Sequence, residues 1–325
     1  MAKGLRMEAA FDPAQNAVRK AEHVGSEETG FLCEHCRVPV EHVSGYVVNG
    51  HDQRLRREVP SFFKLPSRGG AGHQPGCEHT PLGLVKALVH ASEAVEDALN
   101  PFAESEADGG YIFRINIAAH EVAQQGEPGE GKPSREEYRE RIERVWSGER
   151  IAPYCRSAVG LARLWAIMEG AEGHRDLRQA VTIQDRGTEI KWEDFFFSMK
   201  RYSRLANRLQ KGSIKHPVAA LIEVRQLGND RGGAFLDCVA MPEAGGAVET
   251  RIAPKIYIPE MYAGAFQAHG RYIGFGNWRY FEPEQPWVSP DGKKTIRYRN
   301  IILRILNKAQ FAAAQLPGEG EENGA

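Results

Sequence analysis

The chain has 325 residues, of which 42% are hydrophobic and 26% are charged. This length predicts two or three compact units, and this composition excludes a wholly disordered or fibrous chain. The net charge of −1 excludes a uniformly basic coat for nucleic acid but allows a local basic patch. No apolar stretch approaches the ~18–20 residues of a membrane-spanning helix or follows Lys3 and Arg6 as in a secretory signal. We therefore expect a cytoplasmic protein without a membrane partner.

Residues 1–29 form a polar N-terminal segment in which only Ala14–His23 has a short helical tendency. Residues 30–80 are rich in glycine and proline, which predicts turns and short extended pieces. Such a segment buries little apolar surface by itself, so it needs a covalent or metal staple.

Three of the five cysteines lie in this second segment, which we predict to be a zinc-binding module. Cys33 and Cys36 form a C-x2-C pair, and His73 and Cys77 form an H-x3-C pair. Zn²⁺ takes four tetrahedral ligands from thiolates and imidazoles, so these four residues predict a closed structural zinc site. His79 is an alternative to His73 as the fourth ligand. Buried free thiols with surface histidines, or a redox-active cysteine pair, are the other interpretations.

The segments FLCEHCRVPVEHVSG, PSFFKLP and HQPGCEH, in this order, resemble the zinc-binding N-terminal segment of the CoiA-like competence family. The resemblance implies zinc ligands at Cys33, Cys36, His73 and Cys77, and it places Phe62, Phe63 and Lys64 in the family's phenylalanine–basic element. In that family a nuclease-like domain follows. No glutamate, aspartate and E-x-K series follows Cys77 here, so we do not extend nuclease activity to this chain.

Residues 81–212 are predicted to be mainly helical, with a linker near 124–133. The predicted elements, in chain order, are a helix over Pro81–Leu99, a strand over Tyr111–Ile117, a helix from Pro133 to about Trp146, a helix over Ala158–Glu169 and a packed helix over Ile190–Leu209.

Residues 213–312 are predicted to be rich in strands, and residues 313–325 to be a disordered acidic tail. The expected strands are Val218–Val224, Ala234–Ala240, Ala247–Ile258, Tyr272–Phe281 and Thr295–Leu306, with a short helix over Pro259–Ala268. Five strands with a helix between the third and the fourth are the plan of an OB-fold, a small β-barrel. The predicted fold class is therefore α+β, with a zinc knuckle, a helical middle and a C-terminal antiparallel OB-like barrel.

Positive charge concentrates near the carboxyl end, where residues 248–311 hold ten Lys and Arg against five Asp and Glu. Single-stranded nucleic acid is held by aromatic rings that stack on bases and by cations that follow the phosphates. The candidate binding residues are Arg271, Tyr272, Trp278, Arg279, Tyr280, Arg297 and Arg299. An ordinary strand with buried rings and solvated charges is the structural alternative.

Our leading hypothesis is a zinc-containing protein that binds nucleic acid, single-stranded DNA in particular, in DNA processing or on a mobile element. We expect binding rather than catalysis. One alternative is a Mg²⁺-dependent nuclease in which Glu223 and Asp237 are the metal ligands. Another is an adaptor for a protein partner. Cys155 and Cys238 have no base partner nearby in the sequence, so we interpret them as core thiols.

Overall fold

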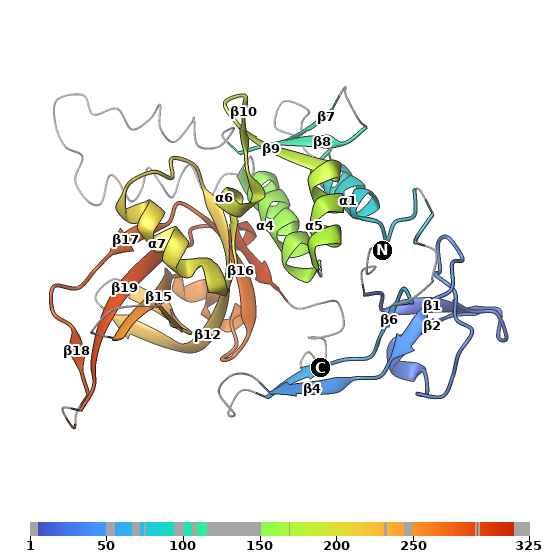
Figure 1. Cartoon of the computed structure of the whole chain (residues 1–325), viewed down its shortest axis with the longest axis horizontal. Coiled ribbons are helices and arrows are strands. Elements are labelled where there is room, and N and C mark those ends of the chain that lie inside the picture. Colours follow the sequence, from blue (N-terminus) through green and yellow to red (C-terminus); the bar gives the residue numbers. More distant parts are fainter. Residues whose placement is uncertain are drawn as a thin grey trace.

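The structure is a computed structural model that describes residues 6–49, 56–66, 72–74, 76–93, 101–105, 109–115, 151–168, 170–230, 233–243, 249–289, 291 and 293–314. It is a mixed α+β fold with a large sheet-rich part (Figure 1). The linker predicted near 124–133, the helix predicted from Pro133 and the tail beyond residue 314 lie outside the described residues. No helix among the described residues has the length and apolar character needed to cross a bilayer.

The N-terminal part consists of short antiparallel strand pairs. They are β1 (Ala9–Asp12) with β2 (Ala17–Lys20), β3 (Glu41–Val43) with β6 (Phe62–Lys64), and β4 (Tyr46–Asn49) with β5 (Arg56–Val59). The helical tendency predicted between Ala14 and His23 is wrong for most of that stretch. Asn16 takes a left-handed φ of 51° and turns the chain into a hairpin, and only η1 (Ala21–His23), a 3-10 turn, is helical.

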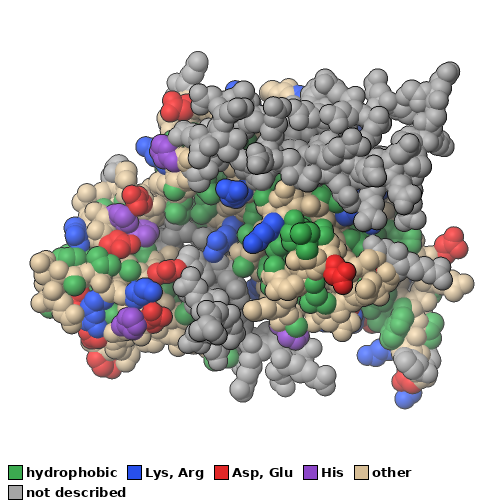
Figure 2. All heavy atoms as spheres, turned by 180° about the vertical axis from the view of Figure 1, so that it is seen from behind, with side chains coloured by type: hydrophobic (Ala, Val, Ile, Leu, Met, Phe, Trp, Pro, Cys, Tyr) green, Lys and Arg blue, Asp and Glu red, His purple; other side chains and the backbone are tan. Residues whose placement is uncertain are grey.

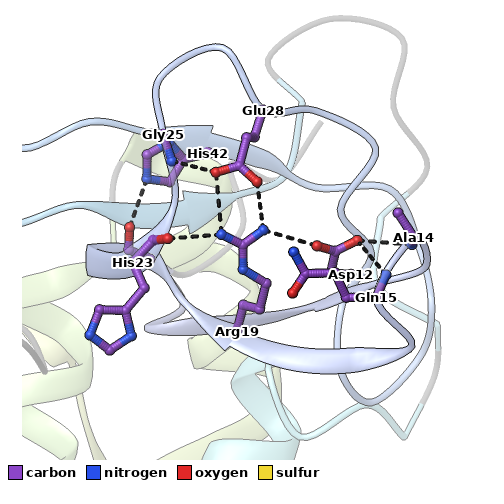
Figure 3. Close-up of polar contacts among 9 residues, drawn as sticks. Asp12, Ala14, Gln15, Arg19, His23, Gly25, Glu28 and His42 are labelled. Carbon is purple, nitrogen blue, oxygen red and sulfur yellow. Dashed lines mark hydrogen bonds and ion pairs between the residues drawn. The ribbon is translucent and has the colours of Figure 1, made fainter.

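The N-terminal strands share one small core. It includes residues of the predicted polar segment (1–29) and of the predicted zinc-binding module (30–80). Met7 is hydrogen-bonded to Phe63 through both backbone groups, and the Phe31 and Phe63 rings are 5.0 Å apart. Arg19 joins the hairpin to the loop that follows it (Figure 3). The buried members of this core are Met7, Ala10, Ala21, Val24, Phe31, Cys33, Val38, Val40, Phe63, Leu65 and Cys77. A core of this size offers little hydrophobic stabilisation.

The middle of the chain combines helices with a four-stranded sheet. The helices are α1 (Pro81–Glu93), α4 (Ile151–Ile167) and α5 (Gly170–Ala180). The strands are β7 (Phe102–Glu104), β8 (Tyr111–Arg114), β9 (Val181–Asp185) and β10 (Thr188–Ile190), in the order β10-β9-β8-β7. The helix predicted from Ala158 begins earlier, at Ile151, because Pro153 is tolerated in a first turn.

The single helix predicted over Ile190–Leu209 is wrong. This stretch contains α6 (Trp192–Phe195), β11 (Phe196–Phe197), η3 (Met199–Arg201) and α7 (Tyr202–Gln210). Phe196 packs in the core of the helical middle, whereas Phe197 packs in the core of the large sheet. Successive side chains point to opposite sides in an extended backbone. Phe196 and Phe197 can therefore pack in two different cores because they lie on a strand rather than on a helix.

The large sheet holds most of the C-terminal third (Figure 1). Its principal strands are β12 (Val218–Asp230), β13 (Gly233–Cys238), β15 (Glu249–Tyr257), β16 (Arg271–Gly276), β17 (Arg279–Phe281), β19 (Thr295–Arg304) and β20 (Phe311–Ala313). Short strands β14 (Met241–Pro242) and β18 (Trp287–Val288) pair with β15 and β19, and the helical turns are η4 (Glu260–Ala265) and η5 (Lys308–Gln310).

The strand order is β17-β19-β15-β13-β12-β16-β20. Long β12 pairs with β16 through its first half and with β13 through its second half, and its register shifts between Val224 and Gln226. Strands β15 and β19 run parallel, whereas the other neighbours on this path are antiparallel. Within the described residues this hydrogen-bonded path is open, with β17 and β20 at its ends, and no closed barrel is found.

Strand β16 lies between two cores, which corrects the single strand predicted over Tyr272–Phe281. Tyr272 packs in the core of the large sheet, and Ile273 and Phe275 pack in the core of the helical middle, where α4 contacts the strand. The strand ends at Gly276, and the chain resumes as β17 at Arg279. Because α4 covers one face of β16 and the core of the large sheet covers the other, neither face is exposed to solvent. Simple alternation predicts one exposed face instead.

Candidate metal centre and strand surface

Four predicted zinc ligands meet in the N-terminal part. We call Cys33, Cys36, His73 and Cys77 the metal centre, because their donor atoms all lie within 4.8 Å of one another. The Cys33 and Cys77 sulfurs are 3.8 Å apart, and His73 Nδ1 is 3.3 Å from Cys36 Sγ and 3.5 Å from Cys77 Sγ. All described cysteines are free thiols.

These separations match the edges of a tetrahedron around a metal ion. Zinc–sulfur bonds of about 2.3 Å and zinc–nitrogen bonds of about 2.0–2.1 Å give S···S edges of about 3.8 Å and S···N edges of about 3.6 Å. The cluster therefore has the donor types and the spacing of a site that could bind a metal ion.

Local backbone geometry aims the first two thiols at the centre. The Cys33 carbonyl accepts the Arg37 N–H at 3.0 Å, and the Cys33 N–H donates to the Val38 carbonyl at 2.7 Å. Arg37 takes a left-handed φ of 60°, and its guanidinium lies 3.7 Å from the centre of the Phe11 ring. A cation–π contact thus accompanies a backbone conformation that most side chains avoid.

Burial shifts the pKa values of donor groups in the metal centre. Burial, together with the nearby His79 and His35, lowers the pKa of His73 to about 4, so this imidazole is neutral at pH 7, as a ligand must be. Burial raises the pKa of Cys77 to about 12, which means that its thiolate needs a compensating positive charge. Burial also acts to raise the pKa of Cys36, but backbone N–H groups of Val38 and Gln74 lower it overall.

His73, rather than His79, is the imidazole at the metal centre. His79 Nε2 lies 3.2 Å from Glu34 Oε1 and belongs to a neighbouring cluster with His35. The second nitrogen of His73, Nε2, is buried without a hydrogen-bond partner. The two histidines that sequence spacing left as alternatives therefore have different surroundings.

The predicted stacking residues Tyr272 and Trp278 are buried, which corrects their assignment to a nucleic-acid surface. Trp278 Nε1 donates to the Val218 carbonyl at 3.2 Å, and the Tyr272 hydroxyl accepts the Gln267 N–H at 2.8 Å. Both rings belong to the core of the large sheet, so neither can stack on a base.

Two predicted phosphate-binding arginines are held by carboxylates. Arg299 is buried and makes a bidentate contact with Glu243 at 2.7 and 2.9 Å, and it also donates to the Tyr280 hydroxyl at 3.1 Å. Arg271 pairs with the buried Glu223 at 2.9 Å. Arg299 thus neutralises Glu243 inside the protein, and the 40% exposed Arg271 side chain neutralises the buried Glu223, whose unpaired charge would be costly.

The remaining predicted residues lie nearer to solvent. Arg279 is exposed on β17, and Arg297 is exposed with Glu282 at 3.7 Å. Tyr280 is half-buried, and its hydroxyl donates to Glu282 at 2.5 Å. Arg279 and Arg297 are therefore the predicted residues that are exposed, whereas Arg271 and Tyr280 are partly exposed.

Glu223 and Asp237 do not form a carboxylate cluster. Arg271 neutralises Glu223, whereas Arg225 and Gln226 contact Asp237. Among the described residues, the groups that could hold a metal ion do not include either acid. Cys155 and Cys238 are buried, and burial raises the pKa of both thiols, as expected of core residues.

The sequence analysis missed a row of rings and cations on the outer side of β13, β15, β19 and β17. The register aligns Phe235 with Tyr257, Tyr257 with Arg304, and Lys255 with the neighbouring Ile302. The inward residues of the same strands, such as Leu236, Ile256, Ile301 and Leu303, are buried in the sheet's core. Alternation along β13 and β15 could have separated these two sets, because inward and outward residues differ by one position.

We call this row the outer face and define it by Phe235, Arg251, Lys255, Tyr257, Arg279, Phe281, Trp287, Tyr298 and Arg304. Phe281 and Trp287 are 53% and 47% exposed. Lys255 Nζ lies 3.9 Å from the centre of the Phe235 ring, and the Arg304 guanidinium lies 5.3 Å from that of Tyr257. Figure 2 shows hydrophobic side chains beside basic and acidic ones at the end of the sheet around β18 (lower right).

Gly228 on β12 allows the Phe235 ring to lie across the neighbouring strand. The two residues are paired in the register, and a Cβ atom at position 228 would come within 2.5 Å of the ring. Glycine therefore fixes where this ring lies on the outer face.

A comparison with protein-family models found no match to the chain, and a search of curated proteins found none either.

Proposed function

We propose that this chain is a zinc-containing protein that binds single-stranded nucleic acid through the outer face. The observation that carries the proposal is the gathering of rings and cations on one side of β13, β15, β19, β17 and β18, with Phe281 and Trp287 about half exposed. Asp230 and Glu249 pair with Lys255 and Arg251 at 2.5 Å, so the exposed Arg279 and Arg304 are the cations of this face on which phosphate binding chiefly relies. Flat rings stack on bases of any sequence, and neighbouring Lys and Arg follow the phosphates. Single-stranded DNA in DNA processing or on a mobile element is the substrate class we favour.

The strand order supports an OB-like interpretation of the large sheet. Long β12 pairs with both β13 and β16, β15 runs parallel to β19, and η4 lies between β15 and β16. If β16 and β17 count as one bent strand, the five strands follow the order of an OB-fold, a partly open barrel. OB-folds bind oligonucleotides on the face of their second and third strands, which correspond here to β13 and β15.

Zinc is the ion that we propose for the metal centre. Three thiolates and one imidazole favour zinc over Mg²⁺ or Ca²⁺, which prefer oxygen ligands. Four protein ligands leave no coordination position open, so the ion would stabilise the fold rather than activate water. The resemblance of this segment to CoiA-like competence proteins agrees with zinc and with a role near DNA.

The test is the binding of a fluorescein-labelled oligothymidylate to the full chain, measured by anisotropy over a range of salt concentrations. Trp287→Ala with Phe281→Ala should weaken binding by about 5–150-fold per stacked base lost, which corresponds to about 1–3 kcal/mol. Arg304→Gln should lower the salt dependence by about one phosphate contact. Val18→Ala and Lys20→Gln change exposed residues of the N-terminal hairpin, so they should leave affinity unchanged.

Absence of oligonucleotide binding at low salt would refute the proposal and favour an adaptor for a protein partner. Equal affinity in the wild type and in the Trp287 and Phe281 variant would refute the outer face as the binding surface. Cleavage of the oligonucleotide in Mg²⁺ that Glu223→Ala abolishes would instead establish a nuclease.

A further inference from the structure

The metal centre is built from a tripeptide that occurs twice. Cys33-Glu34-His35 contains the first cysteine of the centre, and Cys77-Glu78-His79 contains the last. We call the two tripeptides the arms of the centre. In each arm the cysteine belongs to the metal centre, whereas Glu34, His35 and His79 gather in a second group of donor atoms beside it. We call these three residues the adjacent cluster.

The adjacent cluster brings one carboxylate oxygen and two imidazole nitrogens together. Glu34 Oε1 lies 3.2 Å from His79 Nε2 and 3.6 Å from His35 Nε2, and the three donor atoms lie within 4.8 Å of one another. A tetrahedral zinc ion with bonds of about 2.0–2.2 Å would separate an oxygen and a nitrogen ligand by about 3.4 Å. The 3.2 Å contact is also a hydrogen bond, whereas the 3.6 Å contact to Glu34 is too long for one.

The adjacent cluster is partly open to solvent. The side chains of Glu34, His35 and His79 are 27%, 36% and 19% exposed, and Glu78 Oε2 lies 3.3 Å from His35 Nε2. A metal ion held by three protein ligands keeps a position for water, and this openness allows rapid exchange.

Electrostatics favour a second cation at this place. Three thiolates and one neutral imidazole give a zinc-loaded metal centre a net charge of −1, and Glu34 and Glu78 add negative charge nearby. The rings of His73 and His79 are 5.8 Å apart, so the two groups are immediate neighbours.

We propose that Glu34, His35 and His79 form a second, exchangeable site for a divalent transition-metal ion such as Zn²⁺, next to the metal centre. Imidazole and carboxylate ligands without thiolate make it weaker than the metal centre. The proposal rests on the zinc-containing N-terminal part of the proposed function, since a zinc ion at the centre holds both tripeptides in place.

The test measures the zinc bound per full chain as a function of the free zinc concentration. Equilibrium dialysis sets the free zinc, and elemental mass spectrometry measures the bound metal. Wild type should take up a tight first equivalent and a weaker second one. His79→Asn and His35→Asn should keep the first equivalent and weaken the second by about tenfold or more. Cobalt substitution reports the metal centre separately, because thiolate-to-cobalt absorption requires the cysteines.

His23→Asn is the matched control, because His23 is an exposed histidine beside a glutamate in the same part of the chain, with His23 Nε2 3.6 Å from Glu22. It should bind zinc as the wild type does. Uptake of a single equivalent by the wild type, or equal uptake by the wild type and His79→Asn, would overturn the second site. Absence of thiolate–cobalt absorption in the wild type would instead contradict the metal centre itself.

Discussion

Arg19 connects three pieces of the N-terminal part through one guanidinium group (Figure 3). Its Nη1 contacts Asp12 at 3.0 Å and Glu28 at 2.5 Å, and its Nη2 donates to the His23 carbonyl at 2.8 Å. The same guanidinium lies 5.8 Å from the centre of the Phe31 ring, a core residue. Hydrogen bonds from Arg19 lower the pKa of both carboxyl groups. One side chain therefore fixes the hairpin against the loop that leads to the first cysteine.

We predict that Arg19→Met increases hydrogen exchange at Phe11 and Leu32, whose backbone groups bond to each other across this junction. A carboxyl group with a lowered pKa stabilises the fold above its unfolded pKa and ceases to do so as pH falls through its folded pKa. The difference between variant and wild type should therefore be fully present at pH 7, start to decrease below about pH 4, and disappear only as pH falls through the lowered pKa values of the folded carboxyl groups.

Lys20→Met is the control for this prediction, because Lys20 is exposed and its ion pair within the described residues is with the exposed Glu22 at 3.8 Å. Acid should remove any bound metal from both variants to the same extent, so the comparison isolates the Arg19 contacts. Equal exchange in Arg19→Met and Lys20→Met at pH 7 would show that the network adds nothing to the stability of this part.

Residue spacing predicted which residues form the metal centre. It did not predict which aromatic residues are buried or which basic residues are paired with acids. Two short motifs specify four ligands because turn geometry is local. In contrast, Arg299 is neutralised by Glu243, which lies 56 positions away, and it also binds Asn207, 92 positions away. A local count of charges therefore overestimates the positive potential of this segment. Partners so far apart in the chain meet only through the tertiary fold.

At the scale of elements, helix α1 begins directly against the loop that carries Cys77. The Thr80 hydroxyl donates to the Cys77 carbonyl at 2.7 Å and accepts the Gly83 N–H at 3.0 Å, so it caps the helix and fixes the loop together. Pro81 occupies the first turn, where its missing N–H costs nothing. A Cβ atom at Gly83 would lie 2.5 Å from the Cys77 carbonyl oxygen. The helix can approach the loop this closely only with glycine at this position.

We predict that Gly83→Ala destabilises the metal-loaded protein by about 1–3 kcal/mol, because the new methyl group overlaps backbone that cannot move without shifting Cys77. It should also speed the transfer of zinc to a competing chelator. Gly173→Ala in α5 is the matched control, since its Cβ would meet only ordinary contacts at 3.4 Å or more. Alanine there should be neutral or stabilising by up to about 1 kcal/mol. Equal chelator kinetics in the two variants would contradict the proposed packing of α1 on the loop.

Elements with a strong local signal were predictable, and those shaped by two cores were not. The start of α1 at Pro81 and the positions of β12, β13, β15 and β19 follow from capping residues and apolar runs. The stretch Ile190–Leu209 has many aromatic residues at helical spacing, yet Phe196 and Phe197 belong to different cores. Strand β16 is similarly buried on both faces. Periodicity describes one buried side, so it fails where a segment has two.

On the scale of the whole molecule, the described residues form three hydrophobic cores. The core of the helical middle and that of the large sheet share neighbouring residues of β11, β12 and β16, so their packing is linked through the same strands. The N-terminal core has its own residues, two of which are cysteines of the metal centre. The stability of the N-terminal part should therefore depend on the metal, and that of the other two cores on burial of apolar side chains.

We predict that removing the metal with a chelator unfolds the N-terminal part alone. Structural zinc contributes about 10 kcal/mol or more of apparent binding free energy to small metal-dependent domains, which exceeds what so small a core can replace. Hydrogen exchange should become fast around Phe31 and Phe63 and stay slow around Phe275 and Ile301. Cys36→Ser should reproduce this pattern without chelator. Oligonucleotide affinity should persist, because the outer face lies on the large sheet. A loss of protection in all three cores at once would show that the metal stabilises the whole fold, and unchanged exchange would show that the N-terminal core needs no metal.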